Sequence, residues 1–251
     1  MNMDISQYIP NFLFILLRAG IVLMLMPVFG SQSFPPQFRI GLAVAIALVL
    51  APVIPFQVAR AEIPAVVARE VMFGMVFGLA ARFIFFSVDM AGQVMSNATG
   101  LSMATLFNPE IGQSTEISQL YGIITMLLFL AMDIHHDLIA VFVRSYEWLP
   151  AGAASAGALA AAGVSFATKL FVIALKISAP VIIAMFITNL LMGFIYKAAP
   201  QINIFFVGYP VHLFVGFLVM LISIPVFVLV MGGYFNGLKD ELSRVVVMMK
   251  G

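Results

Sequence analysis

No cysteine occurs in this chain of 251 residues, which excludes disulfide bonds and thiolate chemistry at a metal or redox centre. Charged residues are also scarce, at 9% of the sequence, whereas an average soluble protein has roughly 25%. The net charge of +1 gives no reason to expect nucleic-acid binding. What fills the sequence instead is hydrophobic residues, at 63%. This composition predicts a membrane protein.

Apolar runs recur along the chain, and several approach the roughly 20 residues that a helix needs to cross a bilayer. They lie at residues 12–29, 40–55, 70–95, 120–132, 138–149 and 165–199, and residues 198–238 contain no Asp, Glu, Lys or Arg. Because proline cannot donate a helical hydrogen bond, a kink or break is expected at Pro180. Pro200, Pro210 and Pro225 are expected to divide the last apolar stretch, which a short amphipathic tail follows. The fold class predicted is an all-α membrane protein of helical hairpins with broken or kinked helices.

One long polar segment, Gly92–Gln119, interrupts these runs with the sequence GQVMSNATGLSMATLFNPEIGQSTEISQ. Water does not hydrate backbone amides inside a bilayer, so irregular backbone at that depth is buried in protein or lines a cavity. The segment is therefore either an exposed loop or part of a pore. Composition alone leaves both interpretations open.

Several apolar runs carry charges, beginning with Arg18 in the first run. Arg82 and Asp89 are seven residues apart, which places them on nearly the same face of a helix, and Gln93 and Asn97 extend that stripe. The stripe is either a structural polar seam against neighbouring subunits or a pore-lining or gating surface. Charged groups within membrane segments are candidates for function by default.

Lys169 and Lys176 repeat the seven-residue spacing. Two cations on one helix face need anionic partners or water, which a lipid headgroup or a carboxylate of another subunit would supply. The alternative is that both side chains extend to the membrane surface. Methionines near the polar segment similarly indicate either ordinary packing or a deformable seal around a passage.

No catalytic constellation is visible in the sequence. Asp133, His135, His136 and Asp137 form a cluster of possible metal ligands, but an aqueous turn or helix end explains it, and no cysteine or HExxH spacing supports zinc. We therefore expect no enzymatic activity, no metal and no cofactor.

Three blocks of sequence resemble the FliR family of flagellar type III export proteins, and injectisome proteins are similar. They occur in the family's order and cover most of the chain: LLRAGIVLMLMPVFGSQSFPPQFRIGLAVAIALVLAP, GLSMATLFNPEIGQSTEISQLYGIITMLLFLAMDIHHDLIAVFVRSYEWLP and PQINIFFVGYPVHLFVGFLVMLISIPVF. The combination of NPEIGQS before a helix with HH, and of PQINIF followed by GYP, is quite specific.

The resemblance implies a non-enzymatic subunit of the flagellar export gate, in the bacterial inner membrane at the basal body. Such proteins assemble with FliP and FliQ around a channel for unfolded flagellar proteins. FlhB associates with that complex, while FlhA and the cytoplasmic export ATPase complex act upstream. The family consists of a FliP-like portion, here residues 1–164, and a FliQ-like helical hairpin with a tail, here residues 165–251. Arg18, Arg82, Asp89, Lys169 and Lys176 would then be buried charges or contacts between subunits.

The resemblance also implies that a loop near residues 100–114 helps to plug the closed channel. Met103, Leu106 and Phe107 would be the occluding side chains. Gly100 would begin the loop. Asn108, Pro109 and Gly112 would set its turn geometry, because proline fixes φ and glycine allows φ > 0.

Two other functions remain compatible with the residues. Broken helices and intramembrane charges are also found in secondary transporters of small solutes, although no convincing internal repeat is present here. The second is a structural nucleator: other subunits would assemble around the chain, but the chain would not line the pore.

Overall fold

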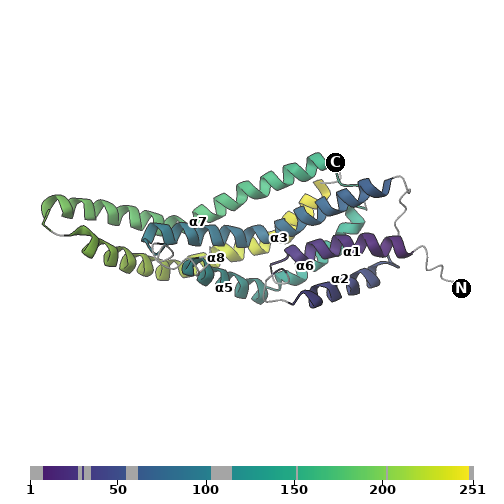
Figure 1. The fold of residues 1–251 in the computed structure, drawn as a ribbon, viewed down its shortest axis with the longest axis horizontal. Coiled ribbons are helices and arrows are strands. Elements are labelled where there is room, and N and C mark those ends of the chain that lie inside the picture. Colours follow the sequence, from purple (N-terminus) through teal and green to yellow (C-terminus); the bar gives the residue numbers. More distant parts are fainter. Residues whose placement is uncertain are drawn as a thin grey trace. The chain divides into compact units, whose positions relative to one another are not determined.

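The fold is described by a computed structural model (Figure 1). The structure describes residues 8–27, 30, 35–54, 62–102, 115–150, 152–201 and 203–248. Within these ranges every regular element is a helix, which confirms the predicted all-α class. In chain order they are α1 (Tyr8–Leu25), α2 (Pro36–Leu50), α3 (Ile63–Thr99), α5 (Glu116–Ala131), α6 (Ile134–Trp148), α7 (Ala156–Ala198) and α8 (Ile204–Met248).

Three of these helices are long and apolar enough to cross a membrane. They are α3, α7 from Gly157, and α8 from Phe206. The pair α5 and α6 is bent at a short break and makes a fourth span if its two halves are counted as one. The break is at Asp133, whose φ of 55° lies in the left-handed region that ends regular helix. The predicted broken or kinked helices are thus present.

Helix α2 begins earlier than the sequence indicates. The predicted apolar run starts at residue 40. Instead, Pro36 is the first residue of the helix and Pro35 is its N-cap. Proline is well tolerated there, because the first helical N–H groups have no intrahelical acceptor and the fixed φ suits the helix.

The prediction that prolines divide the last part of the chain is wrong for α8. Pro200 lies in the turn before the helix, but α8 continues through Pro210 and Pro225 to Met248, so its last residues are not a separate tail. A proline removes one backbone bond, and neighbouring turns keep the helix continuous in a membrane setting. Helix α7 likewise continues through Pro180, and it begins at Ala156 because its alanine-rich first turns favour helix.

The chain divides into two compact units. Unit 1 contains residues up to 83, residues 132–168 and residues from 235, and unit 2 contains residues 84–131 and 169–234. These units follow packing, whereas the predicted portions 1–164 and 165–251 follow likeness to other proteins. The predicted boundary therefore remains a prediction.

Aromatic rings form part of the core of each unit. In unit 1 the ring of Phe77 lies 5.8 Å from that of Phe73 and 6.3 Å from that of Phe142. In unit 2 the ring of Tyr121 meets that of Phe227 edge-on at 4.8 Å. Edge-to-face and offset contacts of this kind add to the burial of apolar area.

Candidate functional site

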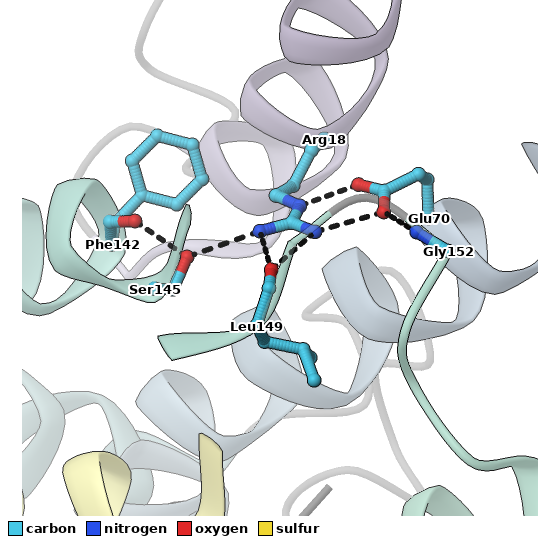
Figure 2. A network of polar contacts seen from close by, with 6 residues as sticks. All are labelled: Arg18, Glu70, Phe142, Ser145, Leu149 and Gly152. Carbon is cyan, nitrogen blue, oxygen red and sulfur yellow. Dashed lines mark hydrogen bonds and ion pairs between the residues drawn. The ribbon is translucent and has the colours of Figure 1, made fainter. Parts of the chain in front are cut away.

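The most elaborate polar arrangement in unit 1 surrounds Arg18, a charged residue in the middle of α1. Its side chain is about 1% exposed, and that of Glu70 on α3 is about 2% exposed. Burying either charge alone would be very costly, so each requires a partner of opposite sign with good geometry. Figure 2 shows the guanidinium of Arg18 facing the carboxylate of Glu70, with α6 and the segment after it closing the other side.

The two side chains are joined by two hydrogen bonds. Nε of Arg18 donates to Oε2 of Glu70 at 2.5 Å, and Nη2 donates to Oε1 at 2.8 Å. This paired geometry is the strongest that arginine makes with a carboxylate. The remaining donors point toward α6 and its end: Nη1 donates to Oγ of Ser145 at 3.3 Å, and both Nη atoms lie 3.4 Å from the carbonyl oxygen of Leu149.

Aromatic rings enclose the same guanidinium. Its central carbon lies 4.3 Å from the ring centre of Phe73 and 4.3 Å from that of Tyr146. A cation over a ring face is stabilised by the negative potential there, and more so when water is excluded. The hydroxyl of Ser145 donates to the carbonyl of Phe142 at 2.6 Å, which orients its oxygen to accept from Arg18 (Figure 2).

A turn at Gly152 completes the network on the Glu70 side. The backbone N–H of Gly152 donates to Oε1 of Glu70 at 3.0 Å, and its carbonyl accepts from Nη1 of Arg69 at 2.6 Å. Its φ is 74°, and a Cβ at this position would lie 2.8 Å from Cγ2 of Val66. Both observations require glycine here.

This network, which we call the Arg18 clamp, consists of Arg18, Glu70, Ser145, Leu149 and Gly152. It connects α1, α3, α6 and the turn before α7, and its five residues all belong to unit 1. Its polar atoms are occupied by one another, so the arrangement holds helices together. The sequence pattern points to Arg18 but not to Glu70. The available signal was the carboxylate at the very start of the predicted run 70–95.

The other predicted charges are less buried. Arg82 and Asp89 on α3 are half-buried, and Nε2 of Gln93 donates to Oδ2 of Asp89 at 2.9 Å. Lys169 and Lys176 on α7 are exposed, and Nζ of Lys176 lies 3.2 Å from the hydroxyl of Tyr234. Contacts of these residues with other subunits stay predictions.

Of the seven residues singled out in the predicted plug, only Gly100 lies among the described residues. It follows the last residue of α3 with a φ of 83°, and its backbone approaches the ring of Tyr209, which would lie 3.4 Å from an added Cβ. The other six predicted positions lie outside the described residues: Met103, Leu106, Phe107, Asn108, Pro109 and Gly112.

The acidic and histidine cluster lies at the break between α5 and α6. Asp133, His135 and His136 offer ligand atoms within 4.8 Å of one another, and Nδ1 of His136 is 3.7 Å from Oδ1 of Asp133. Asp137 pairs instead with Lys239 of α8 at 2.5 Å. The side chains of Asp133 and His136 are each 72% exposed, which describes a solvated helix end better than an enclosed metal centre.

Most of the chain is similar to known bacterial proteins. Residues 9–238 match the model of a family described as bacterial export proteins, family 1. The chain is 30% identical to the flagellar biosynthetic protein FliR of Caulobacter vibrioides, over 89% of this chain and 92% of that protein. It is 27% identical to FliR of Bacillus subtilis, over 99% and 98% of the two chains, and 27% identical to FliR of Escherichia coli, over 84% and 82%.

Proposed function

We propose the function of this chain from its family: the chain belongs to the bacterial export proteins of family 1. Its similarity to proteins named flagellar biosynthetic protein FliR extends over nearly the full length of both partners. The chain is therefore a component of the flagellar export apparatus, and its long apolar helices make it a membrane component. This similarity over nearly the full length is the observation on which the proposal rests.

The finer proposal is that the chain forms, with FliP and FliQ, the channel through which unfolded flagellar proteins leave the cell, in the inner membrane at the flagellar basal body. FlhB would associate with this complex, and FlhA and the export ATPase complex would act on it from upstream. Exposed apolar faces support such an assembly. Of the most apolar stretch of each long helix, 56% is buried in α3, 33% in α7 and only 17% in α8. These faces need a cover of lipid or of other subunits.

The positions of the lysines favour protein or water over lipid as part of that cover. Lys169 and Lys176 are exposed on α7, among exposed apolar residues such as Phe171 and Leu175. A charge at the centre of a spanning helix costs at least about 2.5–3.5 kcal/mol on insertion scales. A neighbouring subunit with carboxylates, or an aqueous space inside an assembly, avoids that cost.

We further propose that the segment near residues 100–114 closes the channel between export events. The test replaces residues 103–114 with a glycine–serine linker of the same length, so that α3 and α5 stay connected. Small-ion conductance is then measured in membranes that carry the assembled complex. An increased leak is expected. A leak equal to that of the unaltered complex, with assembly intact, would disprove the plug.

A crosslinking experiment separates this function from the two alternatives. A photo-reactive amino acid at position 106 should react with an export substrate stalled in the channel, and should give no adduct when no stalled substrate is present. A nucleator remote from the channel gives no adduct in either case. Uptake of a small solute by proteoliposomes containing the chain alone would instead favour a transporter.

A further inference from the structure

The last turn of α3 crosses α8 in unit 2 with almost no space between the two helices. A Cβ added to Gly216 of α8 would lie 2.4 Å from Cγ2 of Thr99 and 3.2 Å from its Cβ. Thr99 is 1% exposed, and its hydroxyl donates to the carbonyl of Met95 at 3.0 Å. Because this bond holds a side chain that is already stiff at χ1, the methyl group cannot turn away without breaking it. Only glycine fits at position 216.

The chain leaves α3 directly beside this crossing. Gly100 has a φ of 83°, and the ring of Tyr209, two turns before Gly216 on α8, would lie 3.4 Å from a Cβ added to Gly100. The backbone N–H of Ser102 donates to the carbonyl of Ser96 at 3.4 Å, which satisfies one of the carbonyls that a helix end leaves free. We call this set of residues the exit contact: Thr99, Gly100, Tyr209 and Gly216.

The chain returns to the same part of α3 at the start of α5. The hydroxyl oxygen of Thr115, the residue before α5, accepts from the backbone N–H of Ser118 at 3.3 Å, as in an N-cap. The hydroxyl of Ser118 donates to the carbonyl of Asp89 at 3.0 Å. A Cβ added to Gly92 would lie 2.5 Å from the Cα of Ser118. We call Gly92, Thr115 and Ser118 the return contact.

The two contacts hold both ends of the intervening chain on one short stretch of one helix. Gly92 and Gly100 are eight residues apart, which at 1.5 Å per residue is about 12 Å along α3. Residues 103–114, which belong to the proposed plug, are connected to the rest of the chain only through these two ends.

The packing at the exit contact leaves no room for gradual sliding. Closely packed helices move past each other in discrete steps, each of which has to find another fitting arrangement. A step of one helical turn would bring His212 or Met220 opposite Thr99, in place of Gly216. Both side chains are far larger than that of glycine, so no neighbouring arrangement of α3 on α8 fits.

We propose that the exit and return contacts stay closed while the export channel opens, so that the plug acts from two stationary ends. This inference rests on the proposed function, because it takes residues 103–114 to be part of the plug. Tyr209 and Gly216 then set the direction in which the chain leaves α3. They are positioning residues for the closed channel.

A disulfide across the exit contact tests whether that contact stays closed. The chain has no cysteine of its own, so the double variant Thr99→Cys, Gly216→Cys contains one possible intrachain pair. The two Cβ atoms would lie 3.2 Å apart, close to the roughly 3.5–4.5 Å of ordinary disulfides. The assembled complex is oxidised in membrane vesicles, and export of a flagellar protein is measured before and after reduction. The single variants Thr99→Cys and Gly216→Cys are the controls, because neither can form the intrachain bond.

The disulfide should form, and export should proceed at equal rates in the oxidised and reduced complexes. A rate that falls on oxidation of the double variant alone, and recovers on reduction, would overturn the proposal, because the exit contact must then open during export. Failure of the disulfide to form in the assembled complex would overturn it as well.

A leak measurement tests the positioning role. Gly216→Ala should displace the end of α3 and raise the small-ion conductance of the resting complex. Adding Thr99→Ser deletes the methyl group and keeps the hydroxyl, so the conductance should return toward that of the unaltered complex. Gly232→Ala is the matched control on the same helix, because nothing lies within 4 Å of its added Cβ. A leak that Thr99→Ser does not reduce would overturn the positioning role.

The complex with the glycine–serine linker at residues 103–114 is measured alongside, which separates this inference from the proposed function. A leak with the linker but none with Gly216→Ala would overturn the positioning role and leave the plug standing. No leak in either complex would disprove the plug itself. If Gly216→Ala does not accumulate, Tyr209→Ala replaces it, because this variant removes a 43% exposed ring from Gly100 and adds no atom, and the same leak is expected.

Discussion

Arg18 and Glu70 meet through two hydrogen bonds of 2.5 and 2.8 Å, although 52 residues separate them in the sequence and both side chains are almost completely buried. A charge in the first apolar run is thus neutralised by one in the N-terminal part of α3. The pair accounts for an arginine that a helix facing lipid would tolerate poorly. The pair also leads to specific predictions about the stability of the fold.

The variant Glu70→Gln should strongly destabilise the chain. It leaves the cation of Arg18 buried with a neutral partner, and breaking one side of a buried pair typically costs about 3–5 kcal/mol. Replacing both residues with methionine should recover much of that loss, because no charge then remains buried. The measurement is the thermal unfolding midpoint in detergent, together with the amount of chain in the membrane.

Lys239→Met is the control for this prediction. Lys239 pairs with Asp137 at 2.5 Å, but the two side chains are 46% and 38% exposed, and such pairs contribute about 0–1 kcal/mol. Its midpoint should stay close to that of the unaltered chain. If Glu70→Gln shifts the midpoint no more than Lys239→Met does, the Arg18 clamp does not stabilise the fold.

A second prediction concerns Gly152, whose backbone donates to Glu70. Gly152→Ala places a side chain at a φ of 74° and brings a Cβ to 2.8 Å from Val66. The left-handed conformation alone costs roughly 1–2 kcal/mol for other residues. Adding Val66→Ala should relieve the contact but not the backbone strain, so recovery of the unfolding midpoint should be partial.

Gly157→Ala is the matched control, since it lies near the start of α7 and an added Cβ would meet only Oγ of Ser155, at 3.9 Å. There alanine should be neutral or stabilising by about 0.5–1 kcal/mol. Full recovery in the Gly152→Ala, Val66→Ala variant would show that the contact, and not the backbone conformation, decides the cost.

The sequence predicts the apolar helices well because their signal is local. Length and hydrophobicity indicate each run, and the polar cluster at 133–137 coincides with the break between α5 and α6. The pairing of Arg18 with Glu70 could not be read in the same way. It depends on how α1 and α3 pack, which no local pattern of residues encodes.

The error in α8 has a related cause. Proline within a sequence usually indicates a helix end, and Pro200 does lie in the turn before α8. Pro210 and Pro225 do not end the helix, because the residues on both sides are strongly apolar and retain their own helical bonds. Rules derived from helices of soluble proteins therefore predicted helix ends that this membrane helix does not have.

A third prediction concerns the close approach of α3 and α5 in unit 2. A Cβ on Gly92 would lie 2.5 Å from the Cα of Ser118, whose hydroxyl donates to the carbonyl of Asp89 at 3.0 Å. Small residues let two helix backbones come this close. Gly92→Ala should therefore force the helices apart and lower the unfolding midpoint. Gly122→Ala, where nothing lies within 4 Å of the added Cβ, should leave it unchanged or raise it. Equal midpoints for the two variants would contradict the packing.

A fourth prediction separates folding from assembly. Lys169 and Lys176 are exposed, and the contact between Lys176 and Tyr234 is at the surface, so replacing both lysines with methionine should leave the midpoint of the isolated chain nearly unchanged. If these cations meet carboxylates of other subunits, the same variant should copurify poorly with FliP and FliQ and should abolish motility.

Lys239→Met again serves as the comparison, because Lys239 is another exposed lysine and its ion pair with Asp137 lies within the chain. It should leave copurification intact. Normal recovery of FliP and FliQ with the double lysine variant would rule out an essential charge contact between subunits on this face of α7. The two cations would then be satisfied by water, by lipid headgroups or by contacts within the chain such as that of Lys176 with Tyr234. Their side chains are long enough to carry the charge away from the apolar surface that their stems cover.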